Sequence, residues 1–284
     1  MRYKILLPTD FSKNSLHAIK YALELYKNDN CDFYILNVFY ATGNIAESLT
    51  HLEPGSELHE MAKIESENGL KNIVDRLNTQ GYKNKKHQFK TISTFNNPLE
   101  AIKNIVEKKD IEMIVMGTKG ITNSKLLAYG NTAIYVMEKV RNCPVIVVPE
   151  KAKQHLPKEI VFPTSYKTHY KRRELNYLID IAKKCEAKIA VLHILEEENL
   201  DENQKEKQQM LKEIFEGVNY SFHELGNNSI ESAINIFIES RDSDMVAFIN
   251  KKHTFFGSIL RQPLVKEMGF NSKVPILVMH DLRN

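Results

Sequence analysis

The segment Tyr3–Asp10 reads Tyr-Lys-Ile-Leu-Leu-Pro-Thr-Asp, and the segment Lys158–Ser165 reads Lys-Glu-Ile-Val-Phe-Pro-Thr-Ser. Each is a short apolar run that closes with Pro-Thr and one polar residue, and each is followed by a helical pattern. In the first of these patterns Leu16, Ile19 and Leu23 recur at spacings of three and four residues, which places them on one face of a helix. The chain therefore contains two copies of one unit, and this repetition decides the fold.

The two copies keep the same order of elements along the chain. We expect strands in the first copy within residues 3–10 and at 33–39, 87–95, 113–116 and 144–148, and in the second within 158–165 and at 188–195, 219–225, 245–249 and 275–279. Amphipathic helical patterns separate them. Continuous β-branched runs between such helices are typical of a parallel sheet covered on both faces, and right-handed crossovers make it doubly wound. The sequence predicts an α/β protein with two tandem, doubly wound, five-stranded parallel sheets that form a pseudo-twofold pair.

The boundary between the copies falls in a polar stretch at residues 150–157. It gives one predicted domain at 1–150 and a second at 157–284. The chain has 284 residues, so each part has the size of an ordinary domain with its own core.

The last predicted strand of each copy begins with a proline, Pro144 or Pro275. Proline restrains pairing and is common at the edges of sheets. An exposed apolar edge invites aggregation, and the simplest way to cover both edges is to pair them. We therefore expect these two final strands to pair with each other across the pseudo-twofold axis.

Composition and charge exclude several classes of protein. Lys and Arg number 39 and Asp and Glu 36, so the net charge of +3 is too small to indicate nucleic-acid binding. No apolar run approaches the ~20 residues that cross a bilayer. The apolar start of the chain stops at Pro8 and Asp10, too early for a signal peptide. We expect a cytoplasmic protein that binds neither nucleic acid nor membrane.

Cysteine and histidine spacings give no metal or redox motif. The cysteines at 31, 143 and 185 lie far apart with no Cys-x-x-Cys pair, which indicates reduced and mostly buried thiols. Histidines and glutamates at 51, 53, 59 and 60 do not have the spacing of a helical metal site. We expect no metal site.

Three short stretches of the first copy are suited to ligand binding, namely Pro8–Asp10, Gly117–Gly120 and Gly130–Thr132. In a doubly wound sheet, ligands bind beyond the carboxyl ends of the strands, where the strand order reverses. Glycine lets backbone N–H groups approach a ligand closely, and the amino end of a helix favours a phosphate. Asp10 is expected to face a sugar or base, because a carboxylate beside phosphates is repelled.

The spacing Gly117-x2-Gly120-x9-Gly130 after an apolar strand resembles the nucleotide-binding motif of the universal stress protein family, in the branch that binds ATP. Asn37-Val38 after the second strand and the final Cys-Pro-Val-Ile-Val-Val-Pro run strengthen the match. The resemblance in element order covers nearly the whole chain, as a tandem pair, while the motif covers only the first copy. It implies the Rossmann-like fold of the adenine nucleotide alpha hydrolases.

The resemblance also implies a nucleotide site, with residues carried over by position. Adenine and ribose would contact Asp10 and the backbone around Val38. The other implied positions are Met116, Gly117 and Gly120 for the ribose and phosphate pocket, Gly130, Asn131 and Thr132 for the phosphates, and Pro8, Thr9 and Lys119 around them. Asn131 stands where the family usually has Ser or Thr; it can donate to a phosphate oxygen, but its reach differs.

Structural explanations stay open for the same residues. Asp10 could cap the first helix, the glycines could serve turns, and Lys119 could be a solvated loop residue rather than a partner of phosphate. The connection at 41–54 could cover the site or be a plain loop.

The second copy departs from the pattern. Ser165 stands where Asp10 stands, and the three spaced glycines are not reproduced after the strand at 245–249. Gln262–Leu264 lies where Gly130–Thr132 would, and Pro263 removes a backbone donor. We expect the second copy to have lost the nucleotide site.

The chain has no GxxxxGK[ST], GxGxxG or GxSxG motif and shows no general base. The leading interpretation is a stress-response regulatory protein that binds ATP, with or without Mg²⁺, in its first half and needs no catalytic residue. Two alternatives stay open: a slow ATP hydrolase or phosphotransferase, and a nucleotide-free interaction module. Expected partners are the adenine nucleotide, the other half of the chain and a second chain in a homodimer.

Overall fold

The structure is a computed structural model that describes residues 2–39, 55–118, 131–195, 199–226, 229–250 and 272–280. The first repeat contains β1 (Tyr3–Pro8), α1 (Lys13–Leu25), β2 (Cys31–Phe39), α3 (Glu57–Thr79), β3 (His87–Phe95), α4 (Pro98–Lys109), β4 (Met113–Gly117), α5 (Asn131–Lys139) and β5 (Val145–Val148). The second contains β6 (Glu159–Thr164), α6 (Arg172–Cys185), β7 (Lys188–Leu195), α7 (Glu202–Ile214), β8 (Tyr220–Gly226), α8 (Ile230–Arg241), β9 (Met245–Asn250) and β10 (Ile276–His280). The predicted α/β repeat is confirmed for these elements. The helix expected between β9 and β10 falls outside the described residues.

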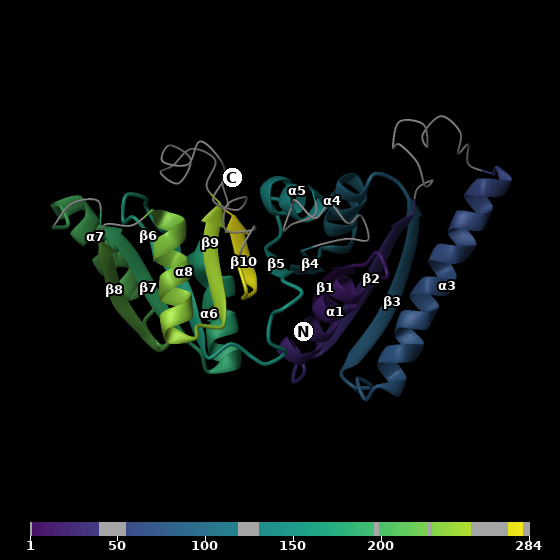
Figure 1. Ribbon diagram of the computed structural model, residues 1–284, viewed down its shortest axis with the longest axis horizontal. Helices are drawn as coiled ribbons and strands as arrows, with labels where there is room; N and C mark the ends of the chain where they lie inside the picture. The colour runs from purple at the N-terminus through teal and green to yellow at the C-terminus, as the bar shows by residue number, and fades with distance from the viewer. Residues whose placement is uncertain are drawn as a thin grey trace.

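The described strands form one sheet in the order β3-β2-β1-β4-β5-β10-β9-β6-β7-β8. Neighbours within each repeat run parallel, and the two repeats meet where β5 pairs antiparallel with β10. The predicted pairing of the two final strands is therefore confirmed (Figure 1). The two five-stranded sheets become one ten-stranded sheet, in which β5 and β10 are central and β3 and β8 form the edges.

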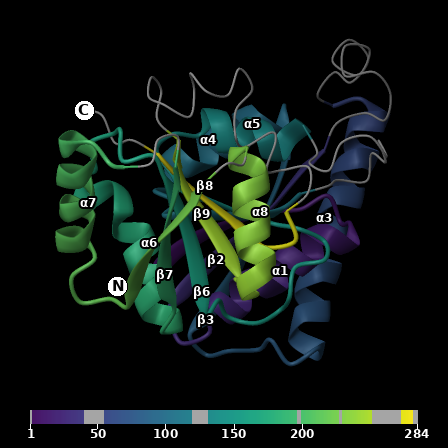
Figure 2. The same ribbon diagram turned by 60° about the vertical axis from the view of Figure 1, so that its left-hand side comes forward.

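Helices cover both faces of this sheet, as Figures 1 and 2 show. One apolar core joins the sheet to α1, α3, α6 and α7, and the other joins it to α4, α5 and α8. Each core contains buried residues of both repeats, for example Ile5 and Leu277 in the first and Val147 and Val246 in the second. The two repeats consequently share their apolar interior.

The helix starts follow from short polar side chains. Asn97 caps α4 through its side chain and Pro98 occupies the first turn, where a missing N–H costs nothing. Ser229 caps α8 by accepting from Ser232 N. The first helix is capped by Ser12, whose Oγ accepts from Ser15 N, so the suggestion that Asp10 caps this helix was wrong.

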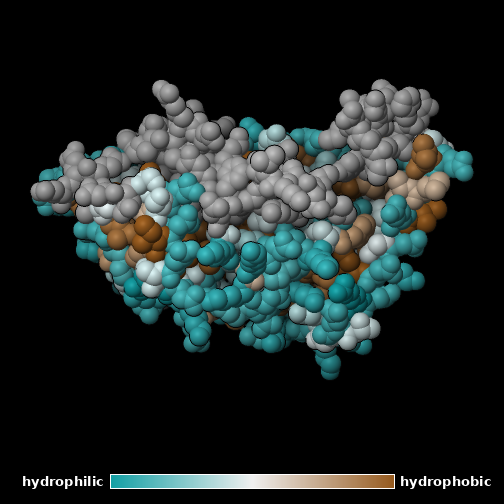
Figure 3. Space-filling view, in the orientation of Figure 1, coloured by the Kyte–Doolittle hydropathy of each residue, from teal (hydrophilic) through white to brown (hydrophobic). Residues whose placement is uncertain are grey.

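Helix α3 is longer than its apolar pattern indicated. It begins at Glu57, after the cap Ser56, but its first fully buried residue is Ser66. Its first turns instead expose Leu58, Met61 and Ile64, each more than half accessible. Apolar side chains are visible over this end of the molecule in Figure 3. The amino-terminal turns thus lack the core contacts that would have marked them as helix in the sequence.

Candidate functional site

The strand order reverses between β1 and β4, and the predicted site residues at the ends of β1, β2 and β4 lie at this reversal. β1 pairs with β2 on one side, with Pro8 opposite Leu36, and with β4 on the other, with Leu6 opposite Ile114. Because the three strands are parallel, their carboxyl ends lie at one edge of the sheet. The structure therefore brings Pro8–Asp10, Val38, Met116 and Gly117 together.

Hydrogen bonds fix the loop that follows β1. The hydroxyl of Thr9, which is buried, pairs with Ser15 Oγ at 2.9 Å and accepts from Phe11 N at 3.1 Å. Asp10 Oδ1 accepts from Ser12 N at 3.1 Å, which closes a turn one residue before α1. Phe11 sits at φ 65°, an uncommon conformation for a non-glycine residue. The Asp10 carboxylate is thus held at the carboxyl edge by its own turn.

The end of β2 is tied to the same loop. Asn37 is buried, and its Nδ2 donates to Thr9 O at 2.8 Å, while Thr9 N donates to Leu36 O at 2.8 Å. Val38 follows, half-buried, one residue beyond this bond. In the sequence, Asn37 stands out only as part of the Asn37-Val38 pair. In the structure, its side chain holds the loop after β1 against β2.

Close packing against Asn14 leaves no room for a side chain at Gly117. A Cβ at this position would lie 2.9 Å from Asn14 Nδ2 and 3.1 Å from the Asn14 backbone carbon. Asn14 is buried and its Nδ2 donates to Thr118 Oγ1 at 3.1 Å. The end of β4 therefore sits directly against the first turn of α1. This contact joins residues more than a hundred positions apart, and no local pattern in the sequence points to Asn14 or Thr118.

Helix α5 starts at Asn131, with Thr132 half-buried in its first turn. The first N–H groups of a helix have no partner within it, and the amino end carries a partial positive charge. Its buried residues, among them Ala133 and Val136, belong to the core that also contains Met116 and Val147. Lys119, Gly120 and Gly130 lie outside the described residues, as does the connection at 41–54.

The corresponding loop of the second repeat has the same hydrogen bonds. Tyr166 N donates to Thr164 Oγ1 at 3.0 Å, and Lys167 N donates to Ser165 Oγ at 3.3 Å. Tyr166 has φ 54°, close to that of Phe11. Ser165 therefore takes the structural place of Asp10, with a hydroxyl where the first repeat has a carboxylate.

Three side chains of the second repeat pack around that second loop. Tyr166 is fully buried, with its ring centroid 4.7 Å from that of His193, and burial raises the pKa of its phenol. His193 takes the place of Asn37 and donates from Nδ1 to Thr164 O at 2.9 Å, because a carbonyl oxygen can only accept. Gln204 donates to Ser165 O at 3.0 Å. Side chains of the second repeat thus pack directly against this loop.

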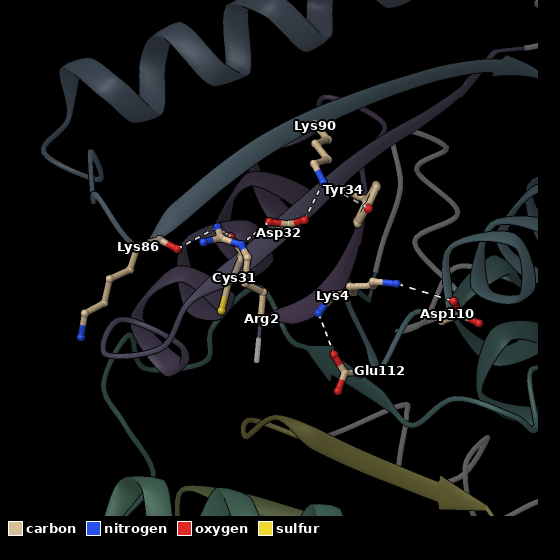
Figure 4. Close-up of polar contacts among 9 residues, drawn as sticks. All are labelled: Arg2, Lys4, Cys31, Asp32, Tyr34, Lys86, Lys90, Asp110 and Glu112. Atoms are coloured by element: carbon tan, nitrogen blue, oxygen red, sulfur yellow. Dashed lines mark hydrogen bonds and ion pairs between the residues drawn. The ribbon is translucent and has the colours of Figure 1, made fainter.

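Figure 4 shows a charged cluster at the amino ends of the first strands. Asp32 accepts from Arg2 Nε at 2.7 Å and from Lys90 Nζ at 2.5 Å. Burial raises the pKa of Asp32, but the hydrogen bonds and charges of Lys90 and Arg2 outweigh burial and hold the pKa below its usual value. Asp32 precedes Val38 by six residues along an extended strand, roughly 20 Å. The cluster therefore lies at the amino ends of the strands and is not part of the predicted site, which lies at their carboxyl ends.

A cavity of about 480 Å³ lies elsewhere, between residues 151–155, α8 and the start of β10, and none of the predicted site residues line it. Several of its charges pair with one another: Lys153 contacts Asp242 at 2.7 Å and Lys273 contacts Glu239 at 3.0 Å. Paired charges of both signs favour no particular ligand.

The cysteines are free, as expected; Cys31 and Cys143 are buried and Cys185 is half-buried. Burial raises the pKa of the Cys31 thiol to about 12 and that of Cys185 to about 11, so both are protonated near neutral pH. Within the described ranges, no three metal-ligating side chains form a cluster. No helix of the described part has the length and hydropathy to cross a bilayer.

Comparison with known proteins gives a consistent result for the first repeat. The profile of the universal stress protein family matches residues 1–149. Universal stress protein MJ0531 of Methanocaldococcus jannaschii is 30% identical over 154 residues, which cover 53% of this chain and 84% of that protein. Universal stress protein MJ0577 of the same organism is 29% identical over 166 residues, covering 53% of this chain and 97% of that protein.

The fold of the whole chain also has a solved counterpart. The crystal structure of a universal stress protein from Archaeoglobus fulgidus superposes with a TM-score of 0.70 and covers 97% of this chain and 95% of that one. The two are 17% identical in sequence, so this likeness concerns the fold.

Proposed function

Because the chain belongs to the universal stress protein family, we propose that its first half binds an adenine nucleotide, ATP, at the carboxyl ends of β1, β2 and β4 and that the bound nucleotide regulates the protein. The observation that carries this proposal is the contrast between the repeats. One fixed loop presents the carboxylate of Asp10 at this edge, whereas the same loop of the second repeat has the hydroxyl of Ser165 in that place and buries Tyr166 against His193.

The residues at the proposed site fit such a ligand by their chemistry. Asp10 and the backbone around Val38 would contact adenine and ribose, and Met116 and Gly117 would line the ribose side. The amino end of α5, with Thr132 in its first turn, would hold the phosphates. Lys119, Gly120, Gly130 and Asn131 would complete the phosphate contacts, with or without Mg²⁺.

Regulation would follow from mass action. A nucleotide that binds one conformation better than another shifts the protein toward that conformation, which a partner can then recognise. We place this activity in a cytoplasmic, stress-response protein that acts without catalysis. We assign residues 1–150 and 157–284 to two domains, the second without a nucleotide, and include association of two chains in the proposal.

The test is calorimetric titration of the full chain with ATP, using two matched variants. Asp10→Ala and Ser165→Ala each remove the side-chain acceptor of the same turn, one in each repeat. We expect Asp10→Ala to weaken ATP binding about tenfold, as for loss of a charged hydrogen-bond partner. Ser165→Ala should leave the affinity unchanged. No binding by the parent chain, or equal losses in both variants, would refute the proposed site.

A further inference from the structure

The last residue of β9 holds the carboxyl end of α5, a helix of the other repeat. Asn250 Nδ2 donates to Met137 O at 3.1 Å, and Arg141 Nη2 donates to Asn250 O at 3.0 Å. Met137 lies in the last turn of α5, where backbone carbonyls have no partner within the helix. The second repeat thus supplies a cap for a helix that it does not contain.

The two hydrogen bonds point in opposite directions and connect the same two segments. One runs from the second repeat to α5 and the other from the residues just after α5 back to the second repeat. Asn250 itself is fixed in the sheet, since it pairs with His280 in the β9–β10 ladder. We call this pair of bonds the Asn250 clamp.

Helix α5 is short enough to transmit a displacement from one end to the other. It has nine residues, or about 14 Å at 1.5 Å per residue. The clamp holds its carboxyl end, and its amino end carries Asn131 and Thr132 of the proposed phosphate site. A change in the direction of the helix axis at the clamp therefore moves the N–H groups that would face the phosphates.

We propose that Asn250 is a positioning residue for the nucleotide site of the first repeat, so that the second repeat sets the affinity of the first for phosphates. This inference rests on the proposed function. The second repeat then has a role in binding besides completing the sheet. The Asn250 clamp orients α5 toward the phosphates, while adenine and ribose are held by the loops after β1 and β2.

The experiment compares Asn250→Ala with Lys184→Ala in the full chain. Lys184 also joins the repeats, through a 2.6 Å contact with Asp29, but packs beside Tyr3 and Tyr26 and away from α5. Calorimetry gives the Kd of ATP and of adenosine for each protein. We expect Asn250→Ala to weaken ATP about fivefold, as for one lost hydrogen bond, and to change adenosine by less than about twofold. Lys184→Ala should change neither ligand by more than about twofold.

A general loss of stability would weaken ATP and adenosine alike, so the difference between the two ligands separates positioning from simple destabilisation. The inference is overturned if Asn250→Ala leaves the ATP affinity unchanged or weakens both ligands equally. If the parent chain binds no ATP, the proposed function fails and with it the effect on phosphates. Amide exchange of residues 132–137 then tests the clamp alone: exchange faster in Asn250→Ala than in Lys184→Ala supports it, and equal exchange overturns it.

Discussion

Val147 of β5 lies directly opposite Ile276 of β10, and both side chains are buried at the centre of the sheet. These strands end the two repeats, so the one antiparallel pairing in the described sheet joins the halves of the chain. An edge that either repeat alone would leave open is covered by the other.

The pairing of β5 with β10 predicts that the whole chain unfolds in one transition, because both apolar cores contain residues of both repeats. Scanning calorimetry should give a single peak with equal calorimetric and van't Hoff enthalpies. Leu277→Ala, at a fully buried position of β10 next to β5, should destabilise the chain by about 2–5 kcal/mol and shift the entire calorimetric peak. Ile236→Ala on the exposed face of α8 should cost less than about 0.5 kcal/mol. Two separated peaks would contradict the prediction.

Gly117→Ala should destabilise the protein by about 1–3 kcal/mol, because its Cβ would press on both the side chain and the backbone of Asn14. The control is Gly226→Ala at the end of β8, where an added Cβ meets no atom of the described residues within 4 Å. Urea unfolding of both variants gives the comparison. Equal stability of the two variants would show that α1 and β4 are not closely packed at Gly117.

Acid stability should depend on Asp32. The pKa of Asp32 in the folded chain lies below its unfolded value near 4, so its stabilising contribution is complete above that value and is lost as the pH falls through the folded pKa. Asp32→Asn removes the contribution at neutral pH, and its free energy of unfolding should therefore fall less steeply than that of the parent below pH 4.

The matched control for this acid effect is Asp110→Asn. Asp110 contacts Lys4 at 3.6 Å but is 88% exposed, and such surface pairs contribute little. Its unfolding curve from pH 3 to 7 should follow that of the parent. If the unfolding curve of Asp32→Asn also follows that of the parent, the contacts of Asp32 with Arg2 and Lys90 in Figure 4 do not stabilise the fold.

Much of the fold could be predicted because its signals are local. Apolar runs predicted the strands, and the proline-led final strands indicated their own pairing, since an open apolar edge has few other solutions. The first turns of α3 were missed because their apolar side chains, Leu58, Met61 and Ile64, are exposed and give no buried helical pattern. At the site, the sequence indicated Pro8–Asp10 and Gly117. It assigned Gly117 to ligand binding, however, and did not show that Asn14 packs against this glycine.

The amino-acid sequence by itself determined the repeat, the parallel α/β order and the difference between the repeats at Asp10 and Ser165, because each is written in the spacing of nearby residues. Only the tertiary structure decided that Tyr166 packs against His193 beside the second loop and that Asn250 caps α5 from the other repeat. These contacts join residues from 27 to 113 positions apart, so they exist only once the sheet has brought distant strands and helices together.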